Sequence, residues 1–207
     1  MNNHNNSEVE AKNISRKRGS RRIDILQAMA QMLHSEQWQK ITTAALAKKI
    51  GFSEAALYRH YRSKAEMLNG LIDFIDQSFI KVFKDIDANA NHNSIIKLKL
   101  MVECLLVFSA NNPGLTRVLT GEVLQNENQD LQKRMMKILL RIEEGWKINL
   151  REAVINKEII NEQNISIAPM LMSYVIGCWW QFSKSGFTIL PNRYFDIHWK
   201  IILQSIK

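Results

Sequence analysis

The sequence predicts an all-α protein in which a small N-terminal helix-turn-helix domain precedes a larger helical body, with about nine helices in total. Apolar residues recur at helical spacing along most of the 207 residues. The chain has only three prolines and eight glycines, which favours long helices, and no stretch alternates as strands do. A chain of this length can bury a substantial core, as one domain or as one domain plus a small satellite.

The first part of the chain is predicted to hold a tail and a small helical domain. Residues 1–15 are polar and Asn-rich, so we expect them to be disordered. Residues 16–66 are assigned to a basic arm and the helix-turn-helix domain. This domain begins with a helix at about 20–35, in which Leu26, Ala30 and Leu33 lie on one face.

Residues 67–207 are assigned to the helical body. A long helix at about 64–87 is expected to connect the two parts, and it is followed by a polar, Asn-rich break. Ser94 is predicted to cap the next helix, and Asn111-Asn112-Pro113-Gly114 marks that helix's end. The periodicity then predicts body helices at about 94–111, 114–124, 130–155, 165–185 and 193–206.

Thr42 to Lys64 reads TTAALAKKIGFSEAALYRHYRSK, which has the pattern of a helix-turn-helix. Thr42 is expected to cap a first short helix, and Gly51 to end that helix in a left-handed conformation. Ser53 is expected to cap a second helix that runs to His60 and can lie in the DNA major groove.

Several side chains of this segment suit DNA. Thr43 is expected to donate its hydroxyl to a phosphate, and Lys64 to hold a phosphate as a point charge. Small Ala55 and Ala56 let the helix approach base edges. The predicted contacts therefore include Thr43, Ser53, Ala55, Ala56, Tyr58, His60 and Lys64.

The charge distribution supports a nucleic-acid partner. The chain carries a net charge of +8, and residues 1–64 hold twelve Lys and Arg against five Asp and Glu. A basic cluster predicts salt-sensitive binding to a polyanion. A solubilising arm and an acidic membrane surface are the alternatives, although no apolar helix face adjoins the cluster. The cluster consists of Arg16, Lys17, Arg18, Arg21 and Arg22.

Other classes of protein find little support. The N-terminus has no apolar signal region, and the longest membrane-like run, Val175–Trp180, is far too short to span a bilayer. Cys104 and Cys178 lie in apolar helical stretches, which indicates core thiols in a reducing cytoplasm. We find no phosphate-binding Gly loop, metal-ligand pair or recognisable nucleophile and base. We therefore expect no enzyme activity, cofactor or metal.

The helix at 165–185 is apolar on nearly every face, so it needs more than one packing partner. A second copy of the same helix is the simplest second partner, and the final helix would complete a four-helix dimer interface. A monomer with one large core is the alternative. A dimer places two recognition helices about 34–36 Å apart, or a multiple of that distance, and so reads a palindrome. The predicted interface residues are Met170, Leu171, Tyr174, Cys178, Trp179, Phe182 and Trp199.

The segment TTAALAKKIGFSEAALYRHYRSKAEML resembles the DNA-binding domain of the TetR-type family. Three segments together are similar to the nucleoid occlusion members of that family, namely SEAALYRHYRSK, LIDFID and NPGLTRVLTGEVL. The resemblance implies a homodimer in the cytoplasm, associated with the nucleoid, that binds palindromic sites scattered over the chromosome. It also implies antagonism of polymers of the tubulin-like division GTPase FtsZ.

The resemblance adds candidate residues. It implies that Thr42, Glu54 and Arg59 join the DNA-contacting set. It also implies that the partner surface lies around Phe74 and Asn112. Asn111 stands where a basic residue is expected, which would weaken or relocate contact with an acidic partner.

Two further functions stay open at this stage. One is a TetR-type repressor that a small molecule releases from its operator, whereas the nucleoid occlusion reading requires no ligand. The other is a helical adaptor that does not bind DNA. One operator beside the protein's own gene would favour the repressor, and many dispersed sites would favour the division regulator.

Overall fold

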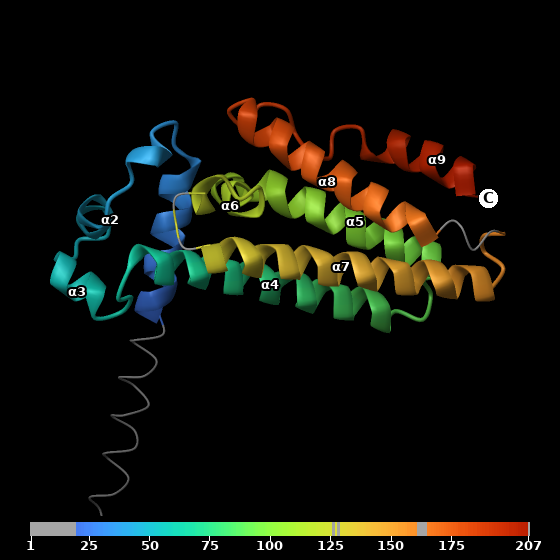
Figure 1. Ribbon diagram of the computed structural model, residues 1–207, viewed down its shortest axis with the longest axis horizontal. Helices are drawn as coiled ribbons and strands as arrows, with labels where there is room; N and C mark the ends of the chain where they lie inside the picture. The colour runs from blue at the N-terminus through green and yellow to red at the C-terminus, as the bar shows by residue number, and fades with distance from the viewer. Residues whose placement is uncertain (1–19, 126, 128, 161–164, 207) are drawn as a thin grey trace, which may run out of the picture. The chain divides into compact units, whose positions relative to one another are not determined.

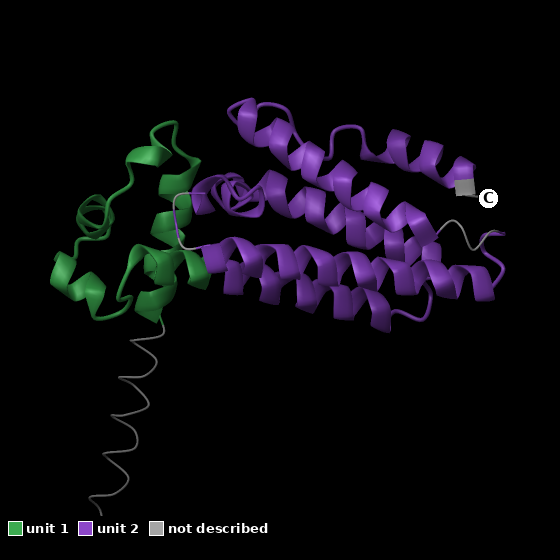
Figure 2. Ribbon diagram, in the orientation of Figure 1, with its two compact units in different colours: residues 1–71 green, residues 72–207 purple. Residues whose placement is uncertain are grey.

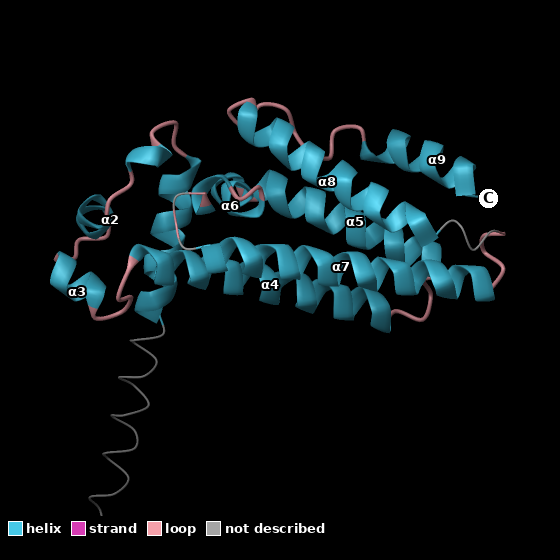
Figure 3. Cartoon of the chain, in the orientation of Figure 1, coloured by secondary structure: helices cyan, strands magenta, loops and turns pink. Residues whose placement is uncertain are grey.

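The computed structural model describes residues 20–125, 127, 129–160 and 165–206, and throughout these residues the regular elements are helices (Figure 1, Figure 3). The predicted all-α class is confirmed, with nine α-helices and two short 3₁₀ helices in the described part of the chain. The tail expected at residues 1–15, and Arg16, Lys17 and Arg18 of the basic cluster, lie outside the described residues.

The chain divides into two compact units, coloured separately in Figure 2. The division falls between Leu71 and Ile72, inside the long helix α4 (Lys64–Ala88), whereas the sequence placed the boundary at residue 66. The first turns of α4 therefore belong to the helix-turn-helix unit, because Met67 and Leu68 are fully buried in its core.

Unit 1 contains a helix at residues 20–34, the 3₁₀ helix η1 (Trp38–Lys40), α2 (Thr43–Lys49), α3 (Glu54–Tyr58) and the start of α4. Apolar side chains at helical spacing form its core, as the sequence predicts. The core residues are Ile25, Met29, Leu33, Leu46, Leu57, Tyr61, Met67 and Leu68.

Unit 2 is a helical bundle. It contains the rest of α4, α5 (Ser94–Asn111), α6 (Pro113–Leu119), η2 (Glu122–Leu124), α7 (Gln129–Ile155), α8 (Ile167–Lys184) and α9 (Phe195–Ile206). Helix α5 packs against both α7 and α8, which also pack against each other (Figure 1). The bundle core includes Leu98, Val102, Leu105, Trp146, Leu150, Val175 and Trp179.

Two helix ends differ from the prediction. The segment expected as one helix at 114–124 is broken, because α6 ends at Leu119 and Gly121 adopts φ +76° before η2 begins. Asn93, rather than Ser94, caps α5 by accepting the Ile96 N–H at 2.9 Å. The Ser94 N–H instead donates to the Glu158 carboxylate at 3.0 Å, which ties the start of α5 to the segment after α7.

A buried charged cluster fixes the break after α6. The Arg117 guanidinium lies 2.8 Å from the Glu122 carboxylate, and both side chains are more than nine-tenths buried. Lys184 Nζ lies 3.1 Å from the same carboxylate, and Arg117 also donates to the Ser183 hydroxyl at 3.3 Å. The cluster therefore joins α6 and η2 to the C-terminal end of α8.

Candidate DNA interface and dimerisation face

The helix-turn-helix is built as the sequence predicts. Thr42 Oγ1 accepts the Ala45 N–H at 3.1 Å and caps α2, and Ser53 Oγ accepts the Ala56 N–H at 3.2 Å and caps α3. Gly51 sits at φ +70°, the left-handed conformation that lets α2 end and the chain turn. A side chain at Gly51 would be strained there even though nothing lies within 4 Å of the position.

Burial decides which face of α3 is available to DNA. Leu57 and, just beyond the helix, Tyr61 are buried and hold α3 on the unit 1 core. The opposite side of α3 is exposed, and the predicted contacts Ser53, Glu54, Ala55 and Tyr58 all lie on that side or at its edge.

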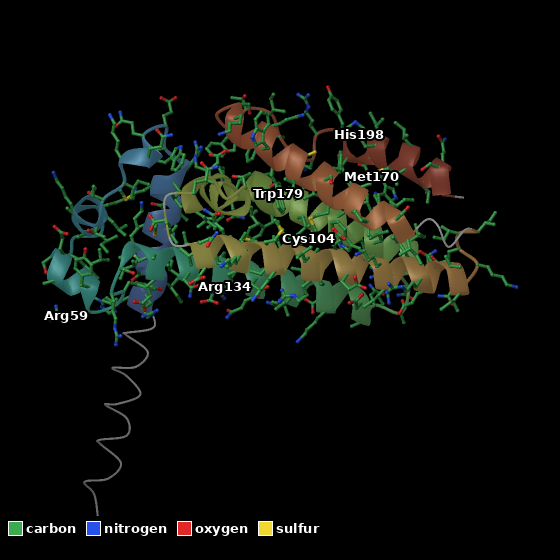
Figure 4. The ribbon with its side chains drawn as sticks, in the orientation of Figure 1. Arg59, Cys104, Arg134, Met170, Trp179 and His198 are labelled. Carbon is green, nitrogen blue, oxygen red and sulfur yellow. The ribbon has the colours of Figure 1, made fainter. Side chains whose placement is uncertain are left out.

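The helix is shorter than predicted. It ends at Tyr58, so Arg59 and His60 lie in the turn after it, where exposed Arg59 stands at the α3 end of unit 1 (Figure 4). Beyond Tyr58, the His60 N–H donates to Leu57 O at 2.9 Å, which is the i→i−3 bond of a turn.

A chain of three hydroxyl and carboxylate groups connects α2 to α3. Thr43 Oγ1 lies 3.2 Å from Glu54 Oε2 and 3.1 Å from the Tyr58 hydroxyl. An ionised carboxylate can only accept, so Thr43 donates to Glu54 and the Tyr58 O–H donates to Thr43. The Thr43 proton is thus donated to Glu54 in the DNA-free structure, and its role as a donor to phosphate stays a prediction.

Arg22 is also engaged within unit 1. Its guanidinium donates to the carbonyl of His60, lies 3.7 Å from the Glu66 carboxylate and sits 4.0 Å from the centre of the Tyr61 ring. These contacts give Arg22 a structural role beside the phosphate contact predicted for it. Arg21 has a looser position, 5.1 Å from the centre of the Phe52 ring.

Lys64 is the first residue of α4, next to a well-formed cap. The Ser63 hydroxyl accepts the Glu66 N–H at 3.1 Å, and the Glu66 carboxylate accepts the Arg62 N–H at 2.6 Å. This reciprocal arrangement fixes the start of α4 and hence the position of the Lys64 backbone. Exposed Arg59 and Arg62 with Lys64 place three cations within six residues after α3.

The residues predicted at the dimer interface fall into two groups. Leu171, Trp179, Phe182 and Trp199 are buried within their own subunit, and the Trp179 indole N–H donates to Leu105 O at 3.2 Å. These four side chains therefore belong to the core face of α8 and α9. Met170, with 48 % of its surface exposed, points away from that face, and Figure 4 labels both Met170 and Trp179.

Tyr174 and Cys178 are half-buried between α8 and α9. The Tyr174 hydroxyl lies 3.1 Å from His198 Nδ1, and burial raises the pKa of the Cys178 thiol. Beside exposed Met170, which the sequence predicts at the interface, the same two helices carry exposed apolar side chains that the sequence does not place there. Their signal is the spacing of apolar residues on a second helix face, at Ile176 and Trp180 in α8 and Ile197 and Ile201 in α9.

The two residues assigned to a protein partner lie in unit 2. Phe74 on α4 exposes 51 % of its surface, although an aromatic side chain usually favours burial. Asn112, half-buried between α5 and α6, donates to Phe108 O at 2.8 Å, and the Phe108 ring packs edge-on against Phe79 at 4.8 Å. One aromatic contact therefore connects α4 to the Asn112 turn.

Unit 2 also contains an open cavity of about 490 Å³. Its lining combines apolar side chains of α4, α5 and α7 with charged residues of the same helices, and Lys84, Lys97 and Arg141 are the cations among them. In the residues that the structure describes, no group of His, Cys, Asp and Glu side chains has a metal-binding arrangement. Within those same residues, no helix combines the length and apolar character needed for a bilayer crossing.

Two family models match the chain. The model described as bacterial regulatory proteins, tetR family, covers residues 25–71, and the one described as tetracyclin repressor-like, C-terminal domain, covers residues 92–207. Among solved structures, the regulator FadR from Bacillus subtilis in complex with stearoyl-CoA superposes with a TM-score of 0.74 over 89 % of this chain and 99 % of that one. Its sequence identity is 16 %, so this likeness shows the fold alone.

Curated relatives are closer. The nucleoid occlusion factor SlmA of Vibrio cholerae is 40 % identical over 194 residues, which cover 92 % of this chain and 98 % of that protein. The SlmA protein of Alteromonas mediterranea is also 40 % identical, over 91 % of this chain and 96 % of its own length. With both parts of the fold matched and a helix-turn-helix in place, the chain belongs to the SlmA family of nucleoid occlusion factors, within the TetR family of DNA-binding regulators.

Proposed function

We propose that this protein is a dimeric nucleoid occlusion factor that binds palindromic sites dispersed over the chromosome and, while bound, antagonises FtsZ polymers over the nucleoid in the cytoplasm. The observation that carries the proposal is the exposed α3 face, capped by Ser53 and followed by three cations, in a chain that shares about 40 % identity with SlmA proteins over nearly its whole length. Binding of DNA to a surface of this kind needs no cofactor.

The DNA-binding part follows from the geometry of unit 1. Buried Leu57 packs α3 on the unit 1 core. The opposite face of the helix, with exposed Ser53 and Tyr58, can therefore enter the major groove. Arg59, Arg62 and Lys64 come directly after α3 and supply phosphate contacts at its edge. Thr42 and Ser53 act mainly as caps that hold the two helix N-termini in place.

Dimerisation is assigned to the exposed apolar face of α8 and α9. Trp180, Met170, Ile197 and Ile201 each expose about half or more of their surface, so pairing with a second copy would remove a large apolar area from water. Two copies give two recognition helices and hence recognition of a palindrome.

The partner surface is assigned to unit 2 around Phe74, together with the Asn112 turn. An exposed aromatic side chain on a rigid helix is the kind of residue that anchors a protein interface. Its position on α4 is supported by the Asp73–Arg134 and Asp76–Arg141 ion pairs with α7, on either side of Phe74.

The test is a sedimentation assay of FtsZ polymers with the full-length dimer, in the presence and absence of sheared chromosomal DNA from the source organism. We expect less polymer in the pellet with protein and DNA together than with either alone. Phe74→Ala should restore the pellet without changing DNA retardation, and Ile148→Ala, which alters an equally exposed apolar side chain on α7, is the matched control. Equal pellets under all conditions would refute the FtsZ proposal.

A ligand-responsive TetR-type repressor is the second candidate, and the cavity of about 490 Å³ in unit 2 is the observation that favours it. Mapping of bound sites across the genome separates the two functions. A single operator beside the protein's own gene would support the repressor, whereas many dispersed sites depleted near the replication terminus would support nucleoid occlusion.

A further inference from the structure

Glu54 is the one acidic residue on a surface that the proposed function places against DNA. It is exposed, it is the first residue of α3, and it lies between the Ser53 cap and the two small residues Ala55 and Ala56. A carboxylate in this place repels phosphates, so it does not increase the affinity for DNA in general. The groups on DNA that such a carboxylate can bind are hydrogen-bond donors.

We infer that Glu54 is a specificity-determining residue that accepts a hydrogen bond from the exocyclic amino group of a cytosine in the major groove. The inference rests on the proposed DNA-binding function, and it identifies the base that the Glu54 side chain recognises. Only the cytosine N4 and adenine N6 amino groups donate hydrogen bonds in the major groove. On the adenine base, the N7 acceptor lies next to the amino group and repels a carboxylate, whereas the cytosine base itself presents no acceptor beside N4 in the major groove.

The hydrogen-bond chain within unit 1 orients this carboxylate. Thr43 donates to Glu54 Oε2 at 3.2 Å, and the Tyr58 hydroxyl lies 3.1 Å from Thr43 Oγ1. Both hydroxyl protons point along the chain toward the carboxylate, so α2 fixes one carboxylate oxygen of this exposed side chain. A flexible Glu side chain would lose rotamer entropy on binding a base, and this prior fixation reduces that cost.

The experiment is selection of DNA from a library of duplexes with twenty random base pairs, followed by sequencing, with the full-length dimer. The unaltered chain should enrich a palindrome with a cytosine at one fixed position of each half-site. At that position, replacing the C·G pair should weaken binding by on the order of tenfold. Glu54→Gln keeps an oxygen that accepts from Thr43 but reads adenine better than cytosine, so its enriched motif should change from cytosine to adenine at that position alone.

Two further variants separate base reading from other roles. Thr43→Val keeps the charge and nearly the shape but removes the donor to Glu54, so the base preference should relax at the same position. Glu36→Gln makes the same change of charge at another exposed site of unit 1 and should leave the motif unaltered.

The outcomes are distinct. If Glu54→Gln enriches the same motif as the unaltered chain, or merely binds every sequence more weakly, Glu54 has a structural role and the inference is wrong while the proposed function stands. If the unaltered chain enriches no motif, the proposed function and this inference both fail. Circular dichroism of each variant confirms that any change in selection comes from a folded protein.

Discussion

The guanidinium of Arg22 lies 4.0 Å from the centre of the Tyr61 ring, and it also donates to the carbonyl of His60. Tyr61 in turn donates its hydroxyl to Arg22 O at 3.4 Å. The two residues thus hold the helix at 20–34 against the turn that follows α3. A residue of the basic cluster that is predicted to bind phosphate therefore also helps to set the position of the recognition helix.

Replacement of Arg22 by Ala should therefore destabilise unit 1. The lost cation–π contact and hydrogen bond correspond to about 1–2 kcal/mol, since the site is partly exposed and water screens the Glu66 ion pair. Hydrogen exchange of the amides between residues 20 and 71 measures the change. Arg21→Ala is the control, because Arg21 makes only the more distant contact with Phe52. Unchanged protection together with a shallower salt dependence of DNA binding would identify Arg22 as a phosphate contact instead.

Replacement of Lys64 by Ala should weaken binding to all DNA sequences alike. A single phosphate contact contributes about one unit to the slope of log affinity against log salt concentration. A salt titration of fluorescence anisotropy should therefore give a slope smaller by about one, with the preferred motif unchanged. Lys133→Ala on α7 changes the same charge in unit 2 and should leave the slope as it is. An identical slope for Lys64→Ala would rule out the phosphate role.

Replacement of Trp180 by Glu should convert the dimer into a folded monomer. Trp180 exposes 55 % of its surface in one subunit, so a charge there is costly only when a second copy covers it. Analytical ultracentrifugation gives the oligomeric state, and thermal unfolding shows that the fold persists. Leu140→Glu, at an equally exposed position on α7, is the control and should stay dimeric. A Trp180→Glu protein that sediments as a dimer would exclude this face.

The contrast between Trp179 and Trp180 shows how far the sequence alone can lead. The spacing of apolar residues and the capping residues predicted the helices well. Thr42, Ser53 and Gly51 act on the backbone within a few residues of themselves, so their roles can be read from the local sequence. On a helix that is apolar on nearly every face, however, spacing does not reveal which face meets the same subunit. Trp179 was assigned to the interface and is in fact fully buried beside Leu105.

The hydrogen bond from Thr43 to Glu54 was missed for a similar reason. A hydroxyl at the start of a helix can reach phosphate, but the structure also pairs it with Glu54, eleven residues later in the chain. Such long-range pairing leaves no periodic signal. The buried pair Arg117 and Glu122 was also missed, although two charged residues inside the apolar segment LTRVLTGEVL are a signal that a buried ion pair exists.

Replacement of Glu122 by Gln should destabilise unit 2 by about 3 kcal/mol at neutral pH, because it leaves the Arg117 charge buried without its carboxylate. Denaturant unfolding measures this difference. Glu144→Gln is the matched control, since Glu144 forms its ion pairs with Lys147 and Arg151 on the surface and should matter little.

The same pair predicts a dependence on pH. Burial alone would raise the pKa of the Glu122 carboxyl, but hydrogen bonds from Lys184, Ser183 and Arg117 outweigh it and hold the pKa below its usual 4.5. A carboxyl whose folded pKa is depressed stabilises the fold above its unfolded pKa and loses that contribution as pH falls through the folded value. The stability difference between the unaltered chain and Glu122→Gln should therefore be constant near neutrality and shrink progressively below pH 4.5. A difference that stays constant down to acid unfolding would show that the carboxylate charge contributes nothing, and that Glu122 acts only through its shape and hydrogen bonds.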